Sequence, residues 1–320
     1  VNQPVYLRKS NPALMYLMKK VAVVLDLNES DAVVCDFVER IVSRIEFSSI
    51  EFIHVVKNAE IPKDLSDKYP DLITPLDETI KDAVQKTISD FTSICCHDNV
   101  NIHVLEGDKQ KEIPKFAREH DLDLLVIDQG EEDQAHLNFL PKLTRNLTCD
   151  VAIVPATVPE DIRQLLVPID FSKNSGMALQ FAQLLASVDK NITIKGLHLY
   201  RVPNGYRKVG KTFEEFSEVV LENAKSEYRK FLDEYDVDAD TVDMTFQLQS
   251  GDTIPTMINR YALSNKVDMI LIGSRGRDTL SSFVLGSMAE QLITKEHYLP
   301  MVIVKNKGAS LKLWEALLHL

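Results

Sequence analysis

Short apolar runs alternate with longer segments of helical spacing along most of the chain. Runs such as MILIG and MVIVK are continuously apolar, which is typical of strands buried on both faces. Segments such as ALQFAQLLASV repeat their apolar residues at helical intervals. The alternation predicts right-handed βαβ units and a parallel sheet with helices on both faces.

This pattern occurs twice. An offset of 144 positions relates three pairs of landmarks: Asp26 and Asp170, His54 and His198, and Gly107-Asp108 and Gly251-Asp252. At an offset of 145 positions LDLLVID overlays VDMILIG, and at an offset of 150 CDVAIVP overlays LPMVIVK. We therefore predict an α/β protein made of two tandem, doubly wound, five-stranded parallel-sheet domains with a Rossmann-like order.

Element boundaries follow from the same pattern. In the second repeat we expect strands at 164–170, 192–199, 242–248, 267–272 and 300–304, and helices at 174–188, 213–235, 253–265 and 287–296. The expected organisation is an N-terminal extension (1–18), a first domain (19–156), a second domain (157–308) and an amphipathic C-terminal tail (309–320). For the tail, docking on the protein or on a dimer mate is favoured over membrane attachment.

Composition narrows the function classes. The 320 residues are 45% hydrophobic and 26% charged, with no apolar run of membrane-spanning length and no leader pattern, so we expect a cytoplasmic protein without membrane contact. A net charge of -12 disfavours nucleic acid as a partner. Cys95-Cys96-His97 could suggest a metal site, but no second cluster completes one, and a helix end with small buried thiols is favoured.

The candidate chemistry lies in the second repeat. Ligands of doubly wound sheets bind beyond the carboxyl ends of the strands, where strand order reverses. If the first and fourth strands are neighbours there, Asp170 and the loop after Gly273 face one crevice. Glycines at 273 and 276 let backbone N–H groups approach an anion, and Gly286-Ser287 opens a helix whose N-terminus favours phosphate. Arg275 and Arg277 could add charge-assisted contacts.

Each feature also has a purely structural interpretation. Ser287 and Glu290 fit a capping box. Asp170 could be a helix N-terminal acid with Ser172 as the cap, and Gly273 could merely end a strand. The ligand interpretation is favoured because these features converge at the strand ends of one crevice.

The second repeat resembles an ATP-binding domain of the universal stress protein family. The family pattern G-x2-G-x9-G-[S/T] is matched by Gly273, Gly276, Gly286 and Ser287, and LLVPIDFS and GLHLYRVP are similar to the family's first two strands. The resemblance implies an adenine nucleotide alpha hydrolase-like fold and bound ATP, with a magnesium ion. It implies these nucleotide-binding residues: Pro168, Ile169, Asp170, Leu199, Ile272, Gly273, Arg275, Gly276, Gly286, Ser287 and Met288.

The first repeat departs from this pattern. It has Asp128 for Gly273, Glu131 for Gly276, and Pro141-Lys142 near the place of Gly286-Ser287, with the proline expected to open a helix. Carboxylates would repel phosphate oxygens, so we expect no polyphosphate there. Because Asp26 is retained, a nucleoside without phosphates stays open as a ligand. The run EEDQ is interpreted as a solvated loop rather than a cation site.

Three functions follow as hypotheses. The favoured one is a stress-response regulatory protein that binds ATP or a related adenine nucleotide and acts on an unidentified protein partner. The alternatives are a slow ATPase or phosphotransferase of the same fold, and an interaction scaffold without nucleotide, such as a cytosolic partner of a transporter. The family pairs through its last strands, so the resemblance implies that a tandem chain can form this pair within itself. We also expect a homodimer.

Overall fold

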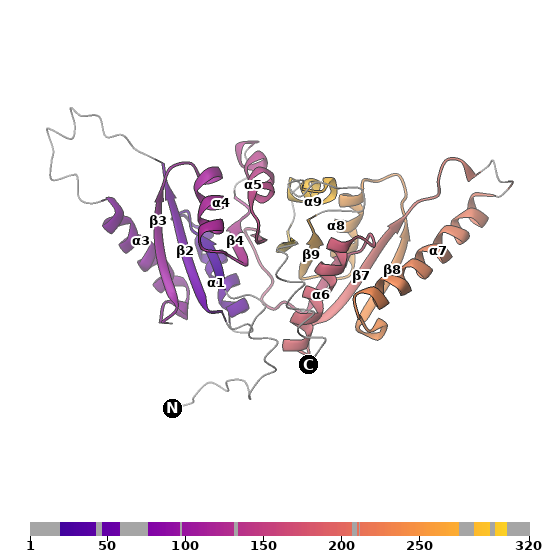
Figure 1. Ribbon diagram of the computed structural model, residues 1–320, viewed down its shortest axis with the longest axis horizontal. Coiled ribbons are helices and arrows are strands. Elements are labelled where there is room, and N and C mark those ends of the chain that lie inside the picture. The colour runs from indigo at the N-terminus through magenta and orange to yellow at the C-terminus, as the bar shows by residue number, and fades with distance from the viewer. Residues whose placement is uncertain are drawn as a thin grey trace. The chain divides into compact units, whose positions relative to one another are not determined.

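The computed structural model describes residues 20–42, 47–57, 76–96, 98–130, 134–206, 210, 212–274, 285–294 and 298–305. The N-terminal extension, the C-terminal tail, Glu131, Arg275 and Gly276 lie outside these residues. The chain forms two compact units (Figure 1). The first unit holds the described residues through Asp128 together with Leu147–Cys149, and the second holds Gln129–Asn146 and Asp150–Lys305.

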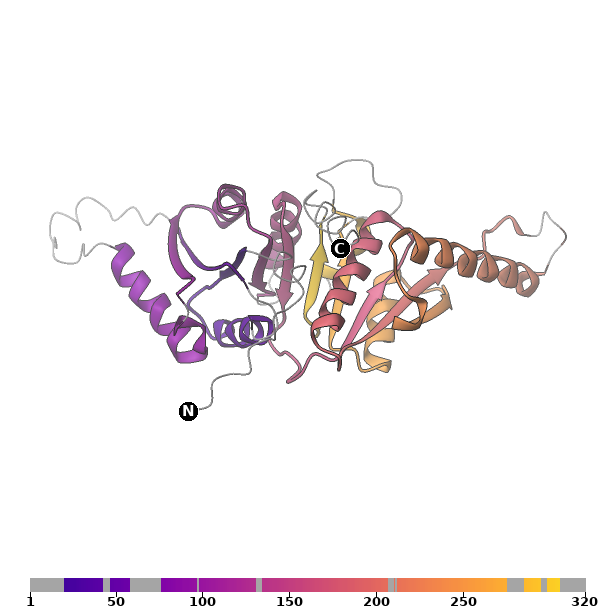
Figure 2. The ribbon, with the colours of Figure 1, turned by 60° about the horizontal axis from the view of Figure 1, so that its bottom comes forward.

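The first unit is a parallel sheet of strand order β3-β2-β1-β4. Its elements are β1 (Lys20–Val24), α1 (Ser30–Val42), β2 (Ser49–Val56), α3 (Leu76–Phe91), η3 (Ser93–Cys96), β3 (Val100–Glu106), α4 (Lys109–Glu119) and β4 (Leu124–Asp128). Helices α1 and α3 cover one face of the sheet and α4 covers the other (Figure 2). This is the doubly wound arrangement expected from the alternation of strands and helices.

The second unit has the strand order β5-β10-β9-β6-β7-β8. Its elements are α5 (Gln134–Asn146), β5 (Asp150–Val154), β6 (Gln164–Pro168), α6 (Lys173–Val188), β7 (Thr193–Tyr200), α7 (Phe213–Glu234), η5 (Ala239–Thr241), β8 (Val242–Leu248), α8 (Ile254–Ser264), β9 (Met269–Gly273), α9 (Ser287–Ile293) and β10 (Met301–Val304). Helices α6 and α7 lie on one face of the sheet and α8 on the other (Figure 2).

The predicted α/β fold is confirmed. In the second repeat each strand begins and ends within two residues of its expected position. Strands β4 and β9 are buried along their whole lengths, which explains why their sequences are continuously apolar rather than alternating. The domain boundaries at 156 and 157 remain a prediction from the repeat, while α5 and β5 pack within the second compact unit.

The two repeats share details of backbone geometry. The N–H of Leu25 donates to the carbonyl of Ile53 at 2.9 Å, and the N–H of Ile169 donates to Leu197 at 2.8 Å. Two residues after Leu25 and Ile169, the backbone has a positive φ, which is 56° at Leu27 and 60° at Phe171. Such values are rare for bulky side chains, so their recurrence at the same place supports the 144-residue offset.

One helix start differs from its prediction. Pro141 does not open a helix: α5 begins at Gln134 and Pro141 lies in its interior. The segment QAHLNFL before the proline carries enough helix-forming residues to extend the helix backwards, at the cost of one backbone hydrogen bond at the proline. The first repeat thus has helix where the second repeat has its glycine-rich stretch.

The last strands of the two repeats pair with each other. Strand β10 is parallel to β9 and antiparallel to β5, with Val302 opposite Ala152. Asp150 accepts a hydrogen bond from the Lys305 N–H at 2.7 Å, and the Lys305 ammonium donates to the Thr144 carbonyl. The pairing of last strands that the resemblance implied is therefore formed within this chain. No helix in the described part of the chain is long and apolar enough to cross a membrane.

Candidate functional site

The strand order of the second unit reverses between β6 and β9. Strand β6 pairs with β9 through Leu165 and Met269 and, on its other side, with β7. The first and fourth strands of this repeat are therefore neighbours, as the crevice hypothesis required. Asp170 and Gly273 follow or end these two strands, so both lie at the carboxyl edge where doubly wound sheets bind ligands.

A pocket opens at this edge. It has a volume of about 320 Å³, part of which is open to solvent. Its lining comes from the end of β6, from β7, and from helices α8 and α9: Pro168, Ile169, Asp170, Leu197, His198, Leu199, Ile254, Ile258 and Met288. Most of these side chains are apolar, which suits a flat ring system, and Asp170 adds a carboxylate.

The loop that carries Asp170 is tightly held. The Asp170 carboxylate accepts a hydrogen bond from the Ser172 N–H at 3.0 Å. Ser172 is the N-cap of α6 and accepts from the Ser175 N–H at 3.2 Å, as its structural interpretation predicted. Asp170 therefore has a local structural role as well as a place in the pocket.

Gly273 has a packing role that the sequence did not reveal. A Cβ at this position would lie 2.5 Å from the carbonyl carbon of Asn174, in the first turn of α6. Backbone atoms cannot yield easily at that distance, so only glycine fits. The two ends of the glycine-rich stretch are also joined, because the Gly286 N–H donates to the Ser274 carbonyl at 2.8 Å.

The capping box expected at Ser287 is not formed. The N-cap of α9 is Gly286, and Ser287 is the first helical residue. The Glu290 carboxylate accepts a hydrogen bond from Arg145 of α5 at 3.1 Å. A capping box needs its acid three residues after the N-cap, whereas Glu290 lies four residues after Gly286.

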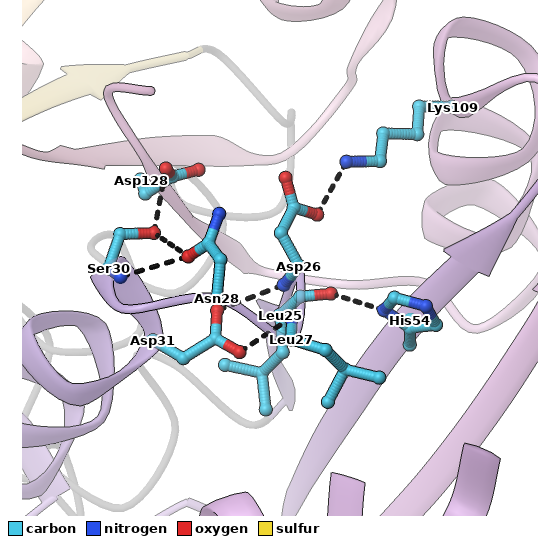
Figure 3. A network of polar contacts seen from close by, with 9 residues as sticks. All are labelled: Leu25, Asp26, Leu27, Asn28, Ser30, Asp31, His54, Lys109 and Asp128. Atoms are coloured by element: carbon cyan, nitrogen blue, oxygen red, sulfur yellow. Dashed lines mark hydrogen bonds and ion pairs between the residues drawn. The ribbon is translucent and has the colours of Figure 1, made fainter. Parts of the chain in front are cut away.

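At the equivalent edge of the first unit, polar and charged side chains contact one another (Figure 3). The Lys109 ammonium at the start of α4 lies 2.5 Å from the Asp26 carboxylate. Asp128, in the place of Gly273, accepts a hydrogen bond from the Ser30 hydroxyl at 3.0 Å. The carboxylate that corresponds to Asp170 thus has an internal cationic partner.

Asp31 adds a third carboxylate to this edge. It is 1% exposed, and its two oxygens accept from the N–H groups of Asp26 and Leu27 at 2.9 and 2.8 Å (Figure 3). Burial raises the pKa of the Asp31 carboxyl, the two hydrogen bonds lower it in part, and the charges of Asp26 and Asp128 raise it again. Three carboxylates near this edge disfavour a phosphate there through charge repulsion.

The structure brings together five of the eleven residues expected to bind nucleotide, since Pro168, Ile169, Asp170, Leu199 and Met288 line the pocket. Ile272 and Gly273 end the neighbouring strand β9, and Gly286 and Ser287 begin α9. Arg275 and Gly276 lie outside the described residues.

Sequence reasoning missed four lining residues: Leu197, His198, Ile254 and Ile258. His198 served only as a landmark of the repeat, paired with His54, and no pattern placed the start of α8 beside the crevice. In the first unit it missed Lys109, although a comparison with Thr253, 144 positions later, could have revealed the added charge. The described residues contain no cluster of three His, Cys, Asp or Glu side chains suited to a metal ion.

Comparisons with known proteins show which sequences and structures this chain is similar to. The model of the universal stress protein family matches residues 161–305. The chain is 27% identical to the universal stress protein MJ0577 of Methanocaldococcus jannaschii over 161 residues, which are 46% of this chain and 97% of that protein.

Two solved structures are similar over both repeats. One is PA1789 of Pseudomonas aeruginosa PAO1, described as functionally unknown, which matches at a TM-score of 0.61 and 14% identity over 97% of this chain and 100% of its own. The other is a universal stress protein of Archaeoglobus fulgidus DSM 4304, which matches at a TM-score of 0.53 and 17% identity over 89% of this chain and 98% of its own. At these identities the likeness is one of fold, and it includes the repeat that the family model leaves unmatched.

Proposed function

Because residues 161–305 belong to the universal stress protein family and the whole chain has the fold of tandem members, we propose that the second repeat binds ATP or a related adenine nucleotide. In this role the protein is a cytoplasmic regulator of a stress response. The observation that carries the proposal is the apolar pocket at the β6–β9 reversal, with Asp170 at its edge.

The residues present fit an adenine nucleotide. The aliphatic side chains of Ile169, Leu199 and Ile258 suit the faces of a purine ring, and the Asp170 carboxylate suits ribose hydroxyls as an acceptor. Gly273, Gly276, Gly286 and Ser287 supply the glycine-rich pattern for the phosphates. A magnesium ion bound with ATP would supply charge neutralisation at the phosphates.

Regulation is favoured over catalysis by the state of the titratable groups in the pocket. Of its nine lining residues, Asp170 and His198 carry ionisable side chains. Asp170 accepts from the Ser172 N–H, and the His198 ring bonds to the Ile169 carbonyl. Both groups thus hold the loop after β6, Asp170 from within it and His198 from the neighbouring strand β7.

Binding by the first repeat is proposed to differ. The Lys109–Asp26 ion pair and the buried Asp31 and Asp128 leave no acceptable place for phosphate at that edge. One nucleotide per chain is therefore expected.

Calorimetric titration of the nucleotide-stripped protein with ATP and magnesium tests the proposal. We expect one site per chain, and no site in a Gly276→Glu variant that copies the first repeat. Gly276→Glu is preferred to a change at Gly273, where any side chain would disturb the packing on Asn174. A matched Glu131→Gly variant should leave the stoichiometry at one.

Absence of binding by the intact protein would overturn the proposal and favour a scaffold without nucleotide. Two equal sites per chain would contradict the assignment of the first repeat as a non-binding half.

A further inference from the structure

His198 in β7 holds the end of β6 in place. Its Nδ1 lies 2.7 Å from the carbonyl oxygen of Ile169. Because a carbonyl oxygen can only accept, Nδ1 carries the proton in this bond. The Ile169 N–H in turn donates to the Leu197 carbonyl at 2.8 Å. The residue directly before Asp170 is therefore bonded to β7 through both its N–H and its C=O.

The residue directly after Asp170 contacts the same imidazole. The ring of Phe171 stacks on that of His198, with a centroid distance of 4.3 Å and an interplanar angle of 27°. Phe171 has a φ of 60°, which is costly for an aromatic residue and persists only where the surroundings hold it. Contacts with Phe231 at 5.7 Å and Tyr228 at 6.5 Å, both in α7, complete that support.

We infer that His198 is a positioning residue for the nucleotide site, because one imidazole fixes both neighbours of Asp170 and so the direction of its carboxylate. The inference rests on the proposed function, since it assigns Asp170 to the bound nucleotide. The imidazole also lines the pocket, so a bound base would contact a ring that is fixed by its hydrogen bond to Ile169 and its stacking on Phe171.

The first unit contains a matched control. His54 has the same bond, with Nδ1 2.8 Å from the Leu25 carbonyl (Figure 3). The residue after Asp26, however, is Leu27, whose side chain is 36% exposed, and the Asp26 carboxylate is bound by Lys109. The hydrogen bond from the histidine to the strand-end carbonyl is thus common to both repeats. In the second repeat the histidine also stacks on an aromatic ring, that of Phe171.

The experiment compares four variants: His198→Phe, His198→Asn, His54→Phe and His54→Asn. Phenylalanine keeps a ring and loses the donor, whereas the asparagine amide can still donate to the carbonyl. ATP affinity is measured by calorimetry, and thermal unfolding is recorded for each variant. We expect His198→Phe to bind about tenfold more weakly because a buried carbonyl loses its donor, and His198→Asn to recover at least a part of this loss.

The His54 variants should lose comparable thermal stability and keep the ATP affinity of the parent protein within about twofold. Unchanged affinity in folded His198→Phe would overturn the inference and leave the proposed function intact. Equal losses in His198→Phe and His54→Phe would also overturn it, because both would then report general destabilisation. No ATP binding by the parent protein would overturn the proposed function itself.

A spectroscopic arm covers a variant that fails to fold. Nitrogen-15 spectra of the parent protein should show Nδ1-protonated imidazoles for both His54 and His198. ATP should shift the His198 signals and leave those of His54 in place. A neutral His198 ring protonated at Nε2 would contradict the assigned role. So would His198 signals that stay unchanged at saturating ATP when calorimetry shows that ATP binds.

Discussion

Asp26 and Asp170 occupy the same place in their repeats, but their carboxylates have different partners. Asp170 accepts from the backbone N–H of Ser172 and borders an apolar pocket. Asp26 is paired with the Lys109 ammonium, in an edge that also holds Asp31 and Asp128 (Figure 3). A repeat can therefore keep its fold and its aspartate while the polar partners of that aspartate change.

The largest expected effect comes from exchanging residues 128 and 273. Gly273→Asp places a Cβ 2.5 Å from the Asn174 backbone and should destabilise the second unit by about 3 kcal/mol. The reverse change, Asp128→Gly, removes one of the two acceptors of the Ser30 hydroxyl and should cost about 1 kcal/mol. Native-state hydrogen exchange of β9 and β4 reports the two units separately. Equal losses of unfolding free energy in Gly273→Asp and Asp128→Gly would contradict the packing role assigned to Gly273.

The next effect tests the aromatic support of the Asp170 loop. Phe171→Leu copies the first unit and removes the stack on His198, so the second unit should lose about 1.5 kcal/mol of unfolding free energy. Leu27→Phe, at an exposed position, is the control and should change stability little. Urea unfolding of both variants measures the difference. A loss below about 0.5 kcal/mol would indicate that the positive φ of Phe171 is relieved by the change.

A smaller effect tests the internal ion pair of the first unit. Lys109→Thr copies Thr253 and leaves Asp26 near Asp31 and Asp128, which should cost about 1 kcal/mol at low salt and less at high salt. Lys109→Arg keeps the charge and serves as control. Unfolding free energies at two ionic strengths measure both variants. A cost that is independent of salt would argue against an electrostatic origin.

The smallest effect at neutral pH concerns Glu51, which is 6% exposed in β2 and bonded to His103 at 2.7 Å. Burial raises its pKa, but hydrogen bonds from His103 and Asn101 and the His103 charge lower it more in sum, to below the ordinary value of 4.5. A lowered folded-state pKa stabilises the protein above the unfolded-state pKa, and this contribution is lost as pH falls through the folded-state value.

The first unit should therefore lose stability as pH falls below about 4.5, and Glu51→Gln should flatten that dependence. Unfolding measured over this pH range checks the slope, with the second unit, where Lys195 takes the place of Glu51, as internal reference. An unchanged slope in the variant would mean that other carboxylates dominate acid unfolding.

The fold was predictable because buried parallel strands leave a strong sequence signal. β9 and β10 are apolar at nearly every position, and the repeat locates each strand twice. Asp170 was predictable because it follows a strand directly and recurs as Asp26. The glycine-rich pattern likewise identified Gly273 and Gly286, which are far apart in sequence from Asp170.

Contacts between distant segments were not predictable. Nothing in the local sequence indicates that Lys109 reaches Asp26, 83 residues earlier, or that Asn174 leaves no room for a Cβ at 273. The interior position of Pro141 was missed because propensity favoured a proline at a helix start, whereas the preceding segment forms helix on its own. These features depend on packing distances that a one-dimensional pattern does not contain.

The antiparallel pairing of β5 with β10 joins the last strands of two repeats within one chain. Between separate chains the same pairing would depend on protein concentration. Strand β10 has β9 on one side and β5 on the other, so neither of its edges can template a further strand. Dilution cannot separate these partners, because the covalent chain sets their effective concentration. Strand β10 is accordingly not available for edge-to-edge pairing with a second copy of the protein.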